Sequence, residues 1–254
     1  MLNSKPVDKL VFLDVEATSQ YRTFDEMPEK LKELFRKRFK IEFDKIDPNW
    51  GQEKSLQYIE NLYNAKAPLH PEWAKIICIS VGRFVSPITA GGDLEFKTKA
   101  FIGEEKEILA SFHKALKPIL DVTFNHPEHL VAHAGMIYDF PMIAKRMILN
   151  RMPLPPALDY SDRKPWDLAY LVDTATTWKY GQFDGGAALD MLAYQFDIAS
   201  SKTTMDGSMV KDEFWEKGNI AGIAHYCNLD VFVLAQVYLR LKNLNNKVIM
   251  TSEN

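Results

Sequence analysis

The chain has 254 residues, of which 46% are hydrophobic and 26% are charged, and its formal net charge is −3. This length can bury one substantial hydrophobic core, so we expect a single domain over residues 1–254. The charge excludes a general attraction to phosphate backbones, so any contact with nucleic acid must be local.

The two cysteines, Cys78 and Cys227, lie far apart in apolar surroundings, without the spacing of a disulfide framework or a metal site. We expect both to be buried free thiols in a reducing cytoplasm. The first residues contain no apolar signal core, and no stretch approaches the ~20 apolar residues that a membrane span needs. The sequence therefore predicts a cytoplasmic protein with no membrane partner.

An apolar run rich in β-formers covers residues 10–15 and predicts a buried strand that ends at an acidic pair. Hydrophobic residues then recur at helical spacing over 28–40, where the basic residues fall largely on another face, and again over 52–65. Prolines break the chain before the next strand. Residues from about 20 to 70 are therefore predicted to form a helical insertion after the first strand.

A strand over residues 75–84 is followed by a Gly-Gly turn at Gly91 and Gly92 and a strand over 94–102, which with the first strand predict an antiparallel meander. The predicted elements that follow are helices over 104–120, 140–150, 187–196 and 219–241, and a strand over 129–133. This order predicts an α/β fold with a mixed sheet, in which an antiparallel three-strand meander is joined by parallel strands and helices cover both faces.

The first candidate site is the sequence LDVEA, which includes Asp14 and Glu16. Residues two apart in a strand project to the same face, so these two carboxylates lie side by side. Neighbouring carboxylates repel each other, and a hard cation such as magnesium or manganese relieves that repulsion. The alternative is a strand that runs out into solvent, where both acids are simply hydrated.

Two further acids follow later in the chain. Asp139 comes after an apolar strand and a small-residue turn, at the start of a helix, where an acid can also be a simple N-cap. Asp230 lies among apolar neighbours in a helix that we expect to start near Asn219, so it needs a partner if it faces the core. Tyr226 is four residues earlier, about 40° around the helix, and shares its face. This pair also fits a core tyrosine that hydrogen-bonds an aspartate.

Taken together, these residues resemble the ordered motifs of the DEDD superfamily of 3'-5' exonucleases. Asp14 and Glu16 match the first motif, residues 133–139 with Tyr138 before the acid match the second, and residues 226–230 match the third. The segments PWDLAYLV, AALDMLAYQFDI and KTTMDGSMV resemble those of predicted exonucleases related to the proofreading domain of family B DNA polymerases. The resemblance implies a ribonuclease H-like fold, which agrees with the strand order above.

The superfamily divides by whether a tyrosine stands four residues before the last aspartate or a histidine five before it, and this sequence has both, Tyr226 and His225. In a continuous helix His225 lies about 140° from Asp230, whereas Tyr226 points toward it. We therefore assign the tyrosine subtype and keep His225 as the alternative general base. Ala134 follows His133 where many relatives carry asparagine, so the polar support of this motif falls to His133 or is missing.

The resemblance also implies catalysis by two divalent cations, two Mg²⁺ or Mn²⁺, about 3.5 to 4 Å apart. By resemblance, Asp14 bridges the ions, Glu16 and Asp230 complete the site of the water-bearing ion, and Asp139 supports the other. Tyr226 would orient the attacking water, since a phenol with a pKa of about 10 is a poor base at neutral pH. The expected activity is stepwise removal of nucleotides from the 3' end of DNA, with single strands preferred.

Contacts with the nucleic acid are expected from several other residues. The basic face of the first insertion helix is suited to guiding the strand toward the carboxylates, although such a charge run is also typical of a solvated surface. The candidates for substrate binding are His133, Tyr138, Lys32, Arg36, Lys37, Lys40 and Lys202.

Two other functions fit the sequence. An RNA-trimming exonuclease of the same superfamily would use the same metal chemistry, because the 2' hydroxyl is recognised by contacts outside these motifs. A nuclease-like fold that only binds nucleic acid or scaffolds an assembly would be expected to lack a metal ligand, and all four are present here. Of the two nucleic acids, we favour DNA over RNA as the partner. Because the chain ends soon after the last predicted helix, any proofreading role is expected to act in trans or to be absent.

Overall fold

The computed structural model describes residues 6–85, 92–123, 125–126, 128–202 and 205–252. Its six-stranded sheet has the order β5-β4-β1-β2-β3-β6, and the strands are β1 (Leu10–Ser19), β2 (Ala74–Phe84), β3 (Leu94–Ile102), β4 (His129–Ala132), β5 (Leu171–Asp173) and β6 (Val248–Ser252). The pairs β1–β2 and β2–β3 are antiparallel, whereas β1–β4, β4–β5 and β3–β6 are parallel. The expected mixed sheet with its meander is confirmed, and part of the predicted Gly-Gly turn lies outside the described residues.

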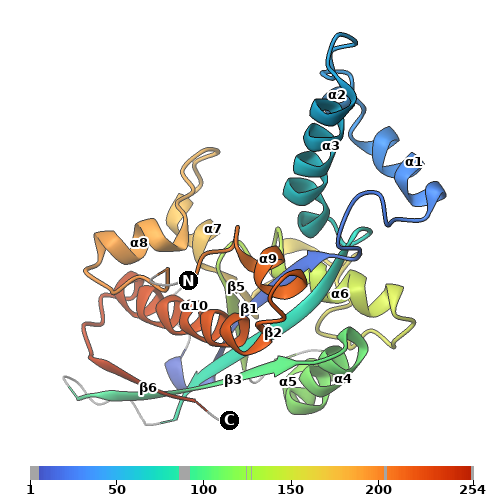
Figure 1. Cartoon of the computed structure of the whole chain (residues 1–254). Coiled ribbons are helices and arrows are strands. Elements are labelled where there is room, and N and C mark those ends of the chain that lie inside the picture. Colours follow the sequence, from blue (N-terminus) through green and yellow to red (C-terminus); the bar gives the residue numbers. More distant parts are fainter. Residues whose placement is uncertain (1–5, 86–91, 124, 127, 203–204, 253–254) are drawn as a thin grey trace.

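Helices cover both faces of the sheet, with α8, α9 and α10 on one face and α4, α5 and α6 on the other (Figure 1). The helices are α1 (Glu29–Arg38), α2 (Lys40–Phe43), α3 (Gln52–Lys66), α4 (Glu105–Ala115), α5 (Lys117–Leu120), α6 (Asp139–Leu149), α7 (Thr174–Lys179), α8 (Leu189–Gln195), α9 (Val210–Trp215) and α10 (Ile220–Leu241), and the short 3-10 helices are η2 (Val7–Lys9), η3 (Ala67–Leu69) and η4 (Pro165–Leu168).

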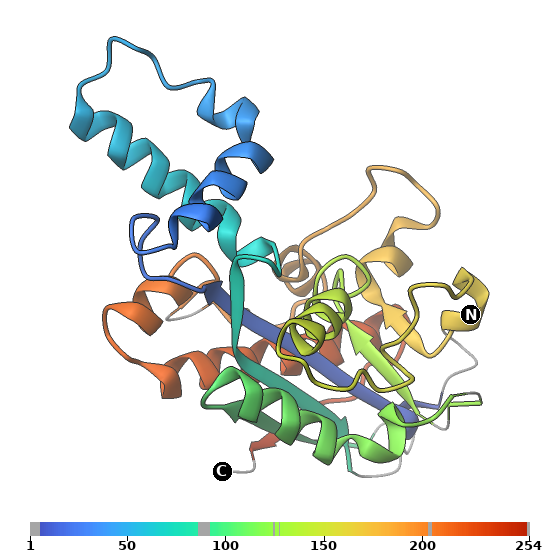
Figure 2. The same ribbon diagram turned by 90° about the vertical axis from the view of Figure 1, so that its right-hand side faces the viewer.

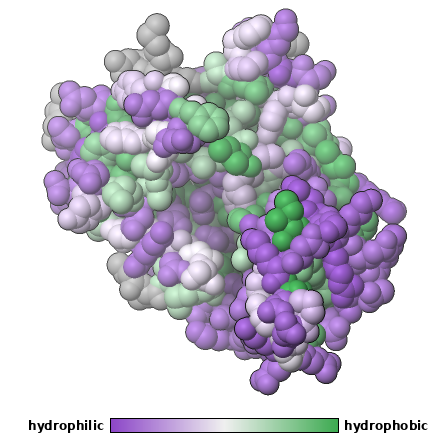
Figure 3. All heavy atoms as spheres, turned by 90° about the horizontal axis from the view of Figure 1, so that it is seen from above, coloured by the Kyte–Doolittle hydropathy of each residue, from purple (hydrophilic) through white to green (hydrophobic). Residues whose placement is uncertain are grey.

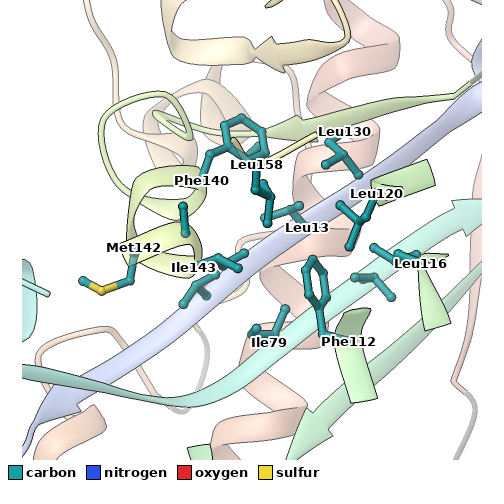
Figure 4. Packing of buried hydrophobic residues seen from close by; sticks show 14 of the residues in the cluster. Leu13, Ile79, Phe112, Leu116, Leu120, Leu130, Phe140, Met142, Ile143 and Leu158 are labelled. Atoms are coloured by element: carbon teal, nitrogen blue, oxygen red, sulfur yellow. The ribbon is translucent and has the colours of Figure 1, made fainter. Parts of the chain in front are cut away.

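Alternate residues of β1 enter two different cores. Leu13 packs into the cluster formed with residues of α4, α5 and α6, which Figure 4 shows from close by. Phe12 packs on the other face, edge to face with Tyr238 of α10 at a ring-centroid distance of 5.6 Å. Because side chains alternate along a strand, Asp14 and Glu16 share the face of Phe12 and lie toward α10.

The residues between β1 and β2 form the helical insertion, which projects from the sheet (Figures 1 and 2). It has a hydrophobic cluster of its own, in which the fully buried Phe35 packs edge to face against Tyr63 and Trp73. An ion pair between Lys211 of α9 and Glu60 of α3, 3.1 Å apart, joins the insertion to the body. The insertion therefore has a defined position beside the sheet.

Several elements differ from those predicted. β1 continues past the acidic pair to Ser19, and its last residues are buried although their side chains are small and polar. The helix predicted over 104–120 is divided into α4 and α5 at Leu116, and Pro118 stands in the first turn of α5, where a proline fits best. The helix predicted over 28–40 ends at Arg38 and is followed by the separate turn α2. The elements β5, β6, α7 and α9 are additional to the prediction, because each has six residues or fewer and gives little periodic signal.

The length and composition of α10 would allow it to cross a membrane, contrary to the expectation that no stretch approaches that length. Half of its most apolar window is buried inside the protein, and the helix packs against β1, β2 and β3. Buried residues such as Val231 and Leu234 belong to the cluster that it forms with the sheet. Its apolar composition is thus explained by its place in the core.

Candidate active site

The acidic pair of β1 lies beside an irregularity in the sheet. Asp14 is paired with Ser80 of β2 and Glu16 with Cys78, and the register then shifts between Glu16 and Ala17. Such bulges re-aim side chains and are frequent next to active sites. Both carboxylates are partly exposed, so a ligand can reach them from solvent.

Helix α10 brings three side chains to this pair. The potential ligand atoms of Asp14, Glu16 and Cys227 all lie within 4.8 Å of one another. The Cys227 thiol donates to Asp14 Oδ2 at 3.3 Å. Tyr226 and Asp230 stand one helical turn apart on α10, both are buried, and each affects the pKa of the other, so their side chains are close. The predicted helix face therefore meets the predicted strand face.

Asp139, the first residue of α6, reaches the same place from the β4 side of β1. The ladder between β1 and β4 ends at Phe12, and among the described residues no strand pairs with the next part of β1 on this side. Asp139 Oδ1 occupies that edge and accepts a hydrogen bond from the backbone N–H of Val15 at 3.1 Å. Its side chain is only 3% exposed. The second predicted motif is thereby fixed directly to the strand that carries the first.

The turn before Asp139 is held by Asp173, which the sequence analysis did not identify. The buried Asp173 carboxylate accepts hydrogen bonds from the backbone N–H groups of Ala134 at 3.1 Å and Met136 at 3.2 Å. Ala134 has a φ of 58°, a strained conformation that an alanine rarely adopts. The two hydrogen bonds to Asp173 help to offset the cost of that conformation. Asp173 also caps the N-terminus of α7. The available signal was an aspartate directly before the sequence TATT, which is typical of an N-cap.

Two other polar residues support the site. Both ring nitrogens of His133 are engaged, with Thr174 Oγ1 at 2.9 Å and the backbone oxygen of Ala187 at 2.8 Å, which favours a positioning role over contact with a substrate. The hydroxyl of the buried Ser201 lies 2.5 Å from Asp230 Oδ1. The sequence analysis left this polar support to His133 or to no residue at all, and the structure shows Asp173 and Ser201 in addition to His133.

Burial raises the pKa of all four carboxyl groups. The pKa values of Asp14 and Glu16 lie well above their ordinary values, first because of burial and then because of the neighbouring acids. Burial raises the pKa of Asp139 to about 7, against hydrogen bonds that lower it, and raises that of Asp230 in the same way. Burial and the charge of Asp230 also hold the pKa of Tyr226 far above its ordinary value. The metal-free cluster therefore resists full ionisation.

Within the described ranges, no lysine, arginine or histidine lies within 4.0 Å of these four carboxylates. Their repulsion is left for a bound cation to relieve, and oxygen donors of this kind suit Mg²⁺ or Mn²⁺. Burial raises the pKa of the Cys227 thiol, so it keeps its proton and donates to Asp14. The donor set therefore fits hard divalent cations.

Comparison with known proteins adds the family. Over residues 69–254 the sequence matches the family described as predicted 3'-5' exonucleases related to the exonuclease domain of PolB. The chain belongs to this family. The exonuclease is thus an enzyme that acts on nucleic acid. Asp139, Tyr226 and Asp230 lie inside the matched residues, whereas Asp14 and Glu16 precede them. No curated protein matches the chain.

Among solved structures, the exonuclease is similar to the family B DNA polymerase from the hyperthermophilic archaeon Pyrobaculum calidifontis, with a TM-score of 0.50 and 12% sequence identity. The match covers 91% of this chain and 24% of the polymerase chain, so the exonuclease spans about a quarter of the polymerase's length. At this identity the likeness shows the fold alone, a ribonuclease H-like exonuclease fold.

The structure separates the two candidates for the third motif of the exonuclease. His225 is exposed, while Tyr226 is buried close to Asp230 and affects its pKa. Lys202 is also near, since its charge lowers the pKa of Asp230. The tyrosine hydroxyl is therefore the group that shares the acidic cluster.

The other predicted substrate contacts lie farther along the chain. Tyr138 donates from its hydroxyl to the backbone oxygen of Pro68 at 3.1 Å, which joins the second motif to the base of the insertion. The remaining predicted contacts stand on the projecting insertion (Figure 1), and they are Lys32, Arg36, Lys37 and Lys40. The structure thus does not bring these four together with the carboxylates.

Proposed function

We propose that this exonuclease hydrolyses phosphodiester bonds from the 3' end of single-stranded DNA, with two Mg²⁺ or Mn²⁺ ions held by its four clustered carboxylates. The observation that carries the proposal is the convergence of Asp14, Glu16, Asp139 and Asp230 from three distant segments. Asp139 and Asp230 are buried, and no described basic side chain pairs with any of the four carboxylates. A purely structural cluster of four acids would be expected to have such partners.

The ions, when bound, would supply a nucleophile from water near neutral pH and stabilise charge on the phosphate and the leaving oxygen. Asp14 and Glu16 extend from a rigid central strand, and Asp139 is fixed by its bond to Val15. The Tyr226 hydroxyl keeps its proton, because burial and Asp230 raise its pKa. We therefore assign the Tyr226 hydroxyl to orienting a water molecule through a hydrogen bond, and not to acting as the base that takes the water's proton.

The preference for a single strand is supported by the depth of the site. Asp139 and Asp230 are 3% and 9% exposed, so only a narrow end can reach them. Figure 3 looks down on the edge from which the insertion rises and shows a hollow between the insertion and the rest of the molecule. An unpaired 3' end fits such a recess more readily than a duplex. The relation of the family to the exonuclease domain of PolB supports DNA as the substrate.

The test is a time course with oligonucleotides labelled at the 3' or the 5' end, as single-stranded DNA, duplex DNA and matched RNA. We expect release of the 3' label first, in Mg²⁺ or Mn²⁺ but not in chelator, with single-stranded DNA cleaved fastest. Asp14→Asn, which keeps the side-chain volume, is the control for contaminating nucleases. Faster cleavage of RNA than of DNA would make RNA the substrate in place of DNA. Cleavage by Asp14→Asn at the rate of the unaltered protein would refute the proposed site.

A further inference from the structure

Three of the four cations predicted to guide the strand are paired with carboxylates of the insertion itself, and Lys37 makes no ion pair with the described residues. Lys32 lies 3.0 Å from Asp25, and Arg36 lies 3.3 Å from Glu29. Lys40 makes a similar ion pair one helical turn along α2. Cations that are already paired attract a phosphate backbone weakly, so this face is a poor guide for the strand.

A different group of cations lines a pocket where the insertion meets the body. The pocket has a volume of about 440 Å³ and lies between the end of α1, the segment that follows η3, and the first turns of α6. Arg38, His70 and Lys145 are its basic groups, and Glu72 is acidic. Within the part of the chain that the structure describes, neither Arg38 nor Lys145 has a carboxylate within 4.0 Å. These cations are available to an anionic ligand.

The environment of His70 shows how positive this pocket is. Burial lowers the pKa of His70, and the charges of Arg38, Lys66 and Lys145 lower it further, while Glu72 opposes them. Arg38 and Lys145 line the pocket beside His70, and Lys66 lies outside the lining but near enough to act on His70, in a chain whose net charge is −3. Such a local excess of positive charge suits a phosphate group.

The rim of the pocket is apolar. Leu69 and Ile137 line it with 56% and 74% of their surface exposed, although large aliphatic side chains are usually buried. A ligand with both an anionic group and an apolar face would cover them. A nucleotide unit of a nucleic-acid strand has that combination, and the pocket has room for about one such unit.

Tyr138 joins the pocket to the candidate active site. It lines the pocket, and the residue that follows it is Asp139. Its partly buried side chain packs against the hydrophobic cluster that includes residues of β1. Its hydroxyl donates a hydrogen bond to the backbone oxygen of Pro68, which fixes the tyrosine beside the base of the insertion.

We propose that the pocket of Arg38, His70 and Lys145 binds a backbone phosphodiester of the substrate strand, with the adjoining nucleoside against Leu69 and Ile137. The proposal rests on the proposed function, since it assigns the path of the strand behind its 3' end. The strand passes from the carboxylates over Tyr138 into the pocket. The mononucleotide product carries similar phosphate chemistry, and the experiment separates the two.

The experiment compares the double variant Arg38→Ala/Lys145→Ala with Lys30→Ala/Lys54→Ala, which removes the same charge from exposed residues outside the pocket. Binding of a fluorescent twelve-nucleotide thymidine oligomer is measured by anisotropy in chelator at several salt concentrations. We expect the pocket variant to bind about tenfold more weakly, and its slope of log affinity against log salt to fall by about 0.7. The control is expected to bind like the unaltered protein.

Hydrolysis gives a second readout. The p-nitrophenyl ester of thymidine 5'-monophosphate reports on the carboxylates without a strand. The ratio of kcat/KM for the oligomer to that for the ester is expected to fall about tenfold in the pocket variant and to stay constant in the control. Equal binding by both double variants would overturn the pocket proposal, as would displacement of the oligomer by thymidine 5'-monophosphate from the unaltered protein but not from the pocket variant. An unaltered protein that binds the oligomer but cleaves neither substrate would instead refute the proposed function.

Discussion

Replacing Asp139 with asparagine should stabilise the metal-free protein while removing its activity. Asparagine keeps an oxygen that can accept the hydrogen bond from the N–H of Val15, now 3.1 Å long, but it carries no charge. The pKa of Asp139 is raised by burial, so its ionised form is disfavoured in the folded protein. The substitution removes that cost and one metal ligand together.

The magnitude follows from the pKa. A rise from 3.8 to about 7, at 1.36 kcal/mol per pH unit, corresponds to about 4 kcal/mol of unfolding free energy. The folded pKa is the higher one, so the unfolded chain loses this proton first as the pH rises. The stability of the metal-free parent therefore falls between about pH 4 and pH 7 and levels off above, whereas Asp139→Asn lacks this part of the fall.

Thermal unfolding in chelator measures the difference. We expect parent and variant to unfold alike at pH 4 and the variant to be more stable by about 4 kcal/mol at pH 8, or roughly 8 to 16 °C in Tm. Saturating Mg²⁺ should raise the Tm of the parent by more than that of Asp139→Asn, because the variant has lost one ligand and keeps Asp14, Glu16 and Asp230. Identical stability profiles for the two proteins from pH 4 to pH 8 would show that this carboxylate ionises normally, and the assignment of the cluster would fail.

Three other substitutions separate catalysis from stability. Asp14→Asn should abolish hydrolysis in Mg²⁺ and Mn²⁺ alike, as measured by release of a 3' label, because it removes the ligand at the centre of the cluster. Tyr226→Phe should lower kcat by about 100-fold with an unchanged metal requirement, since only a positioning hydrogen bond is lost. Glu105→Gln should lower the unfolding free energy in urea by about 3 kcal/mol, because it leaves the buried Arg146, now bonded through two nitrogens, without its charge partner. Glu105→Gln should still cleave the oligonucleotide at urea concentrations below those that unfold it.

Local patterns predicted most of the fold because they depend on short-range geometry. Strand alternation and helical spacing predicted the meander and α10, whose start is fixed by the side chain of Asn219 accepting a hydrogen bond from Gly222. The short strand β5 was beyond such patterns, since it has three residues and is held by pairing with β4. The short strand β6 was also not predicted, because it is held by parallel pairing with β3.

The candidate site likewise contains residues that could be predicted from the sequence and residues that could not. Its four acids could be predicted because each stands at a recognisable place in a strand or helix. Asp173 and Ser201 could not, because their roles depend on contacts with Ala134 and Asp230 far away in the sequence. The basic helix face stays a prediction, and the sequence could not show that Lys32, Arg36 and Lys40 are paired with carboxylates inside the insertion.

The size of the insertion does not disturb the carboxylates, and the register of the sheet explains why. Ser19 at the end of β1 is paired with Ala74 at the start of β2, so the chain leaves the sheet and returns to it at neighbouring positions. The entropy needed to close such a loop grows only slowly with its length, and the antiparallel pairing fixes Asp14 and Glu16 whatever the loop contains. The family match begins at residue 69, near the point where the insertion returns. The insertion is thus free to carry substrate contacts such as Arg38 while the geometry of the acidic cluster stays constant.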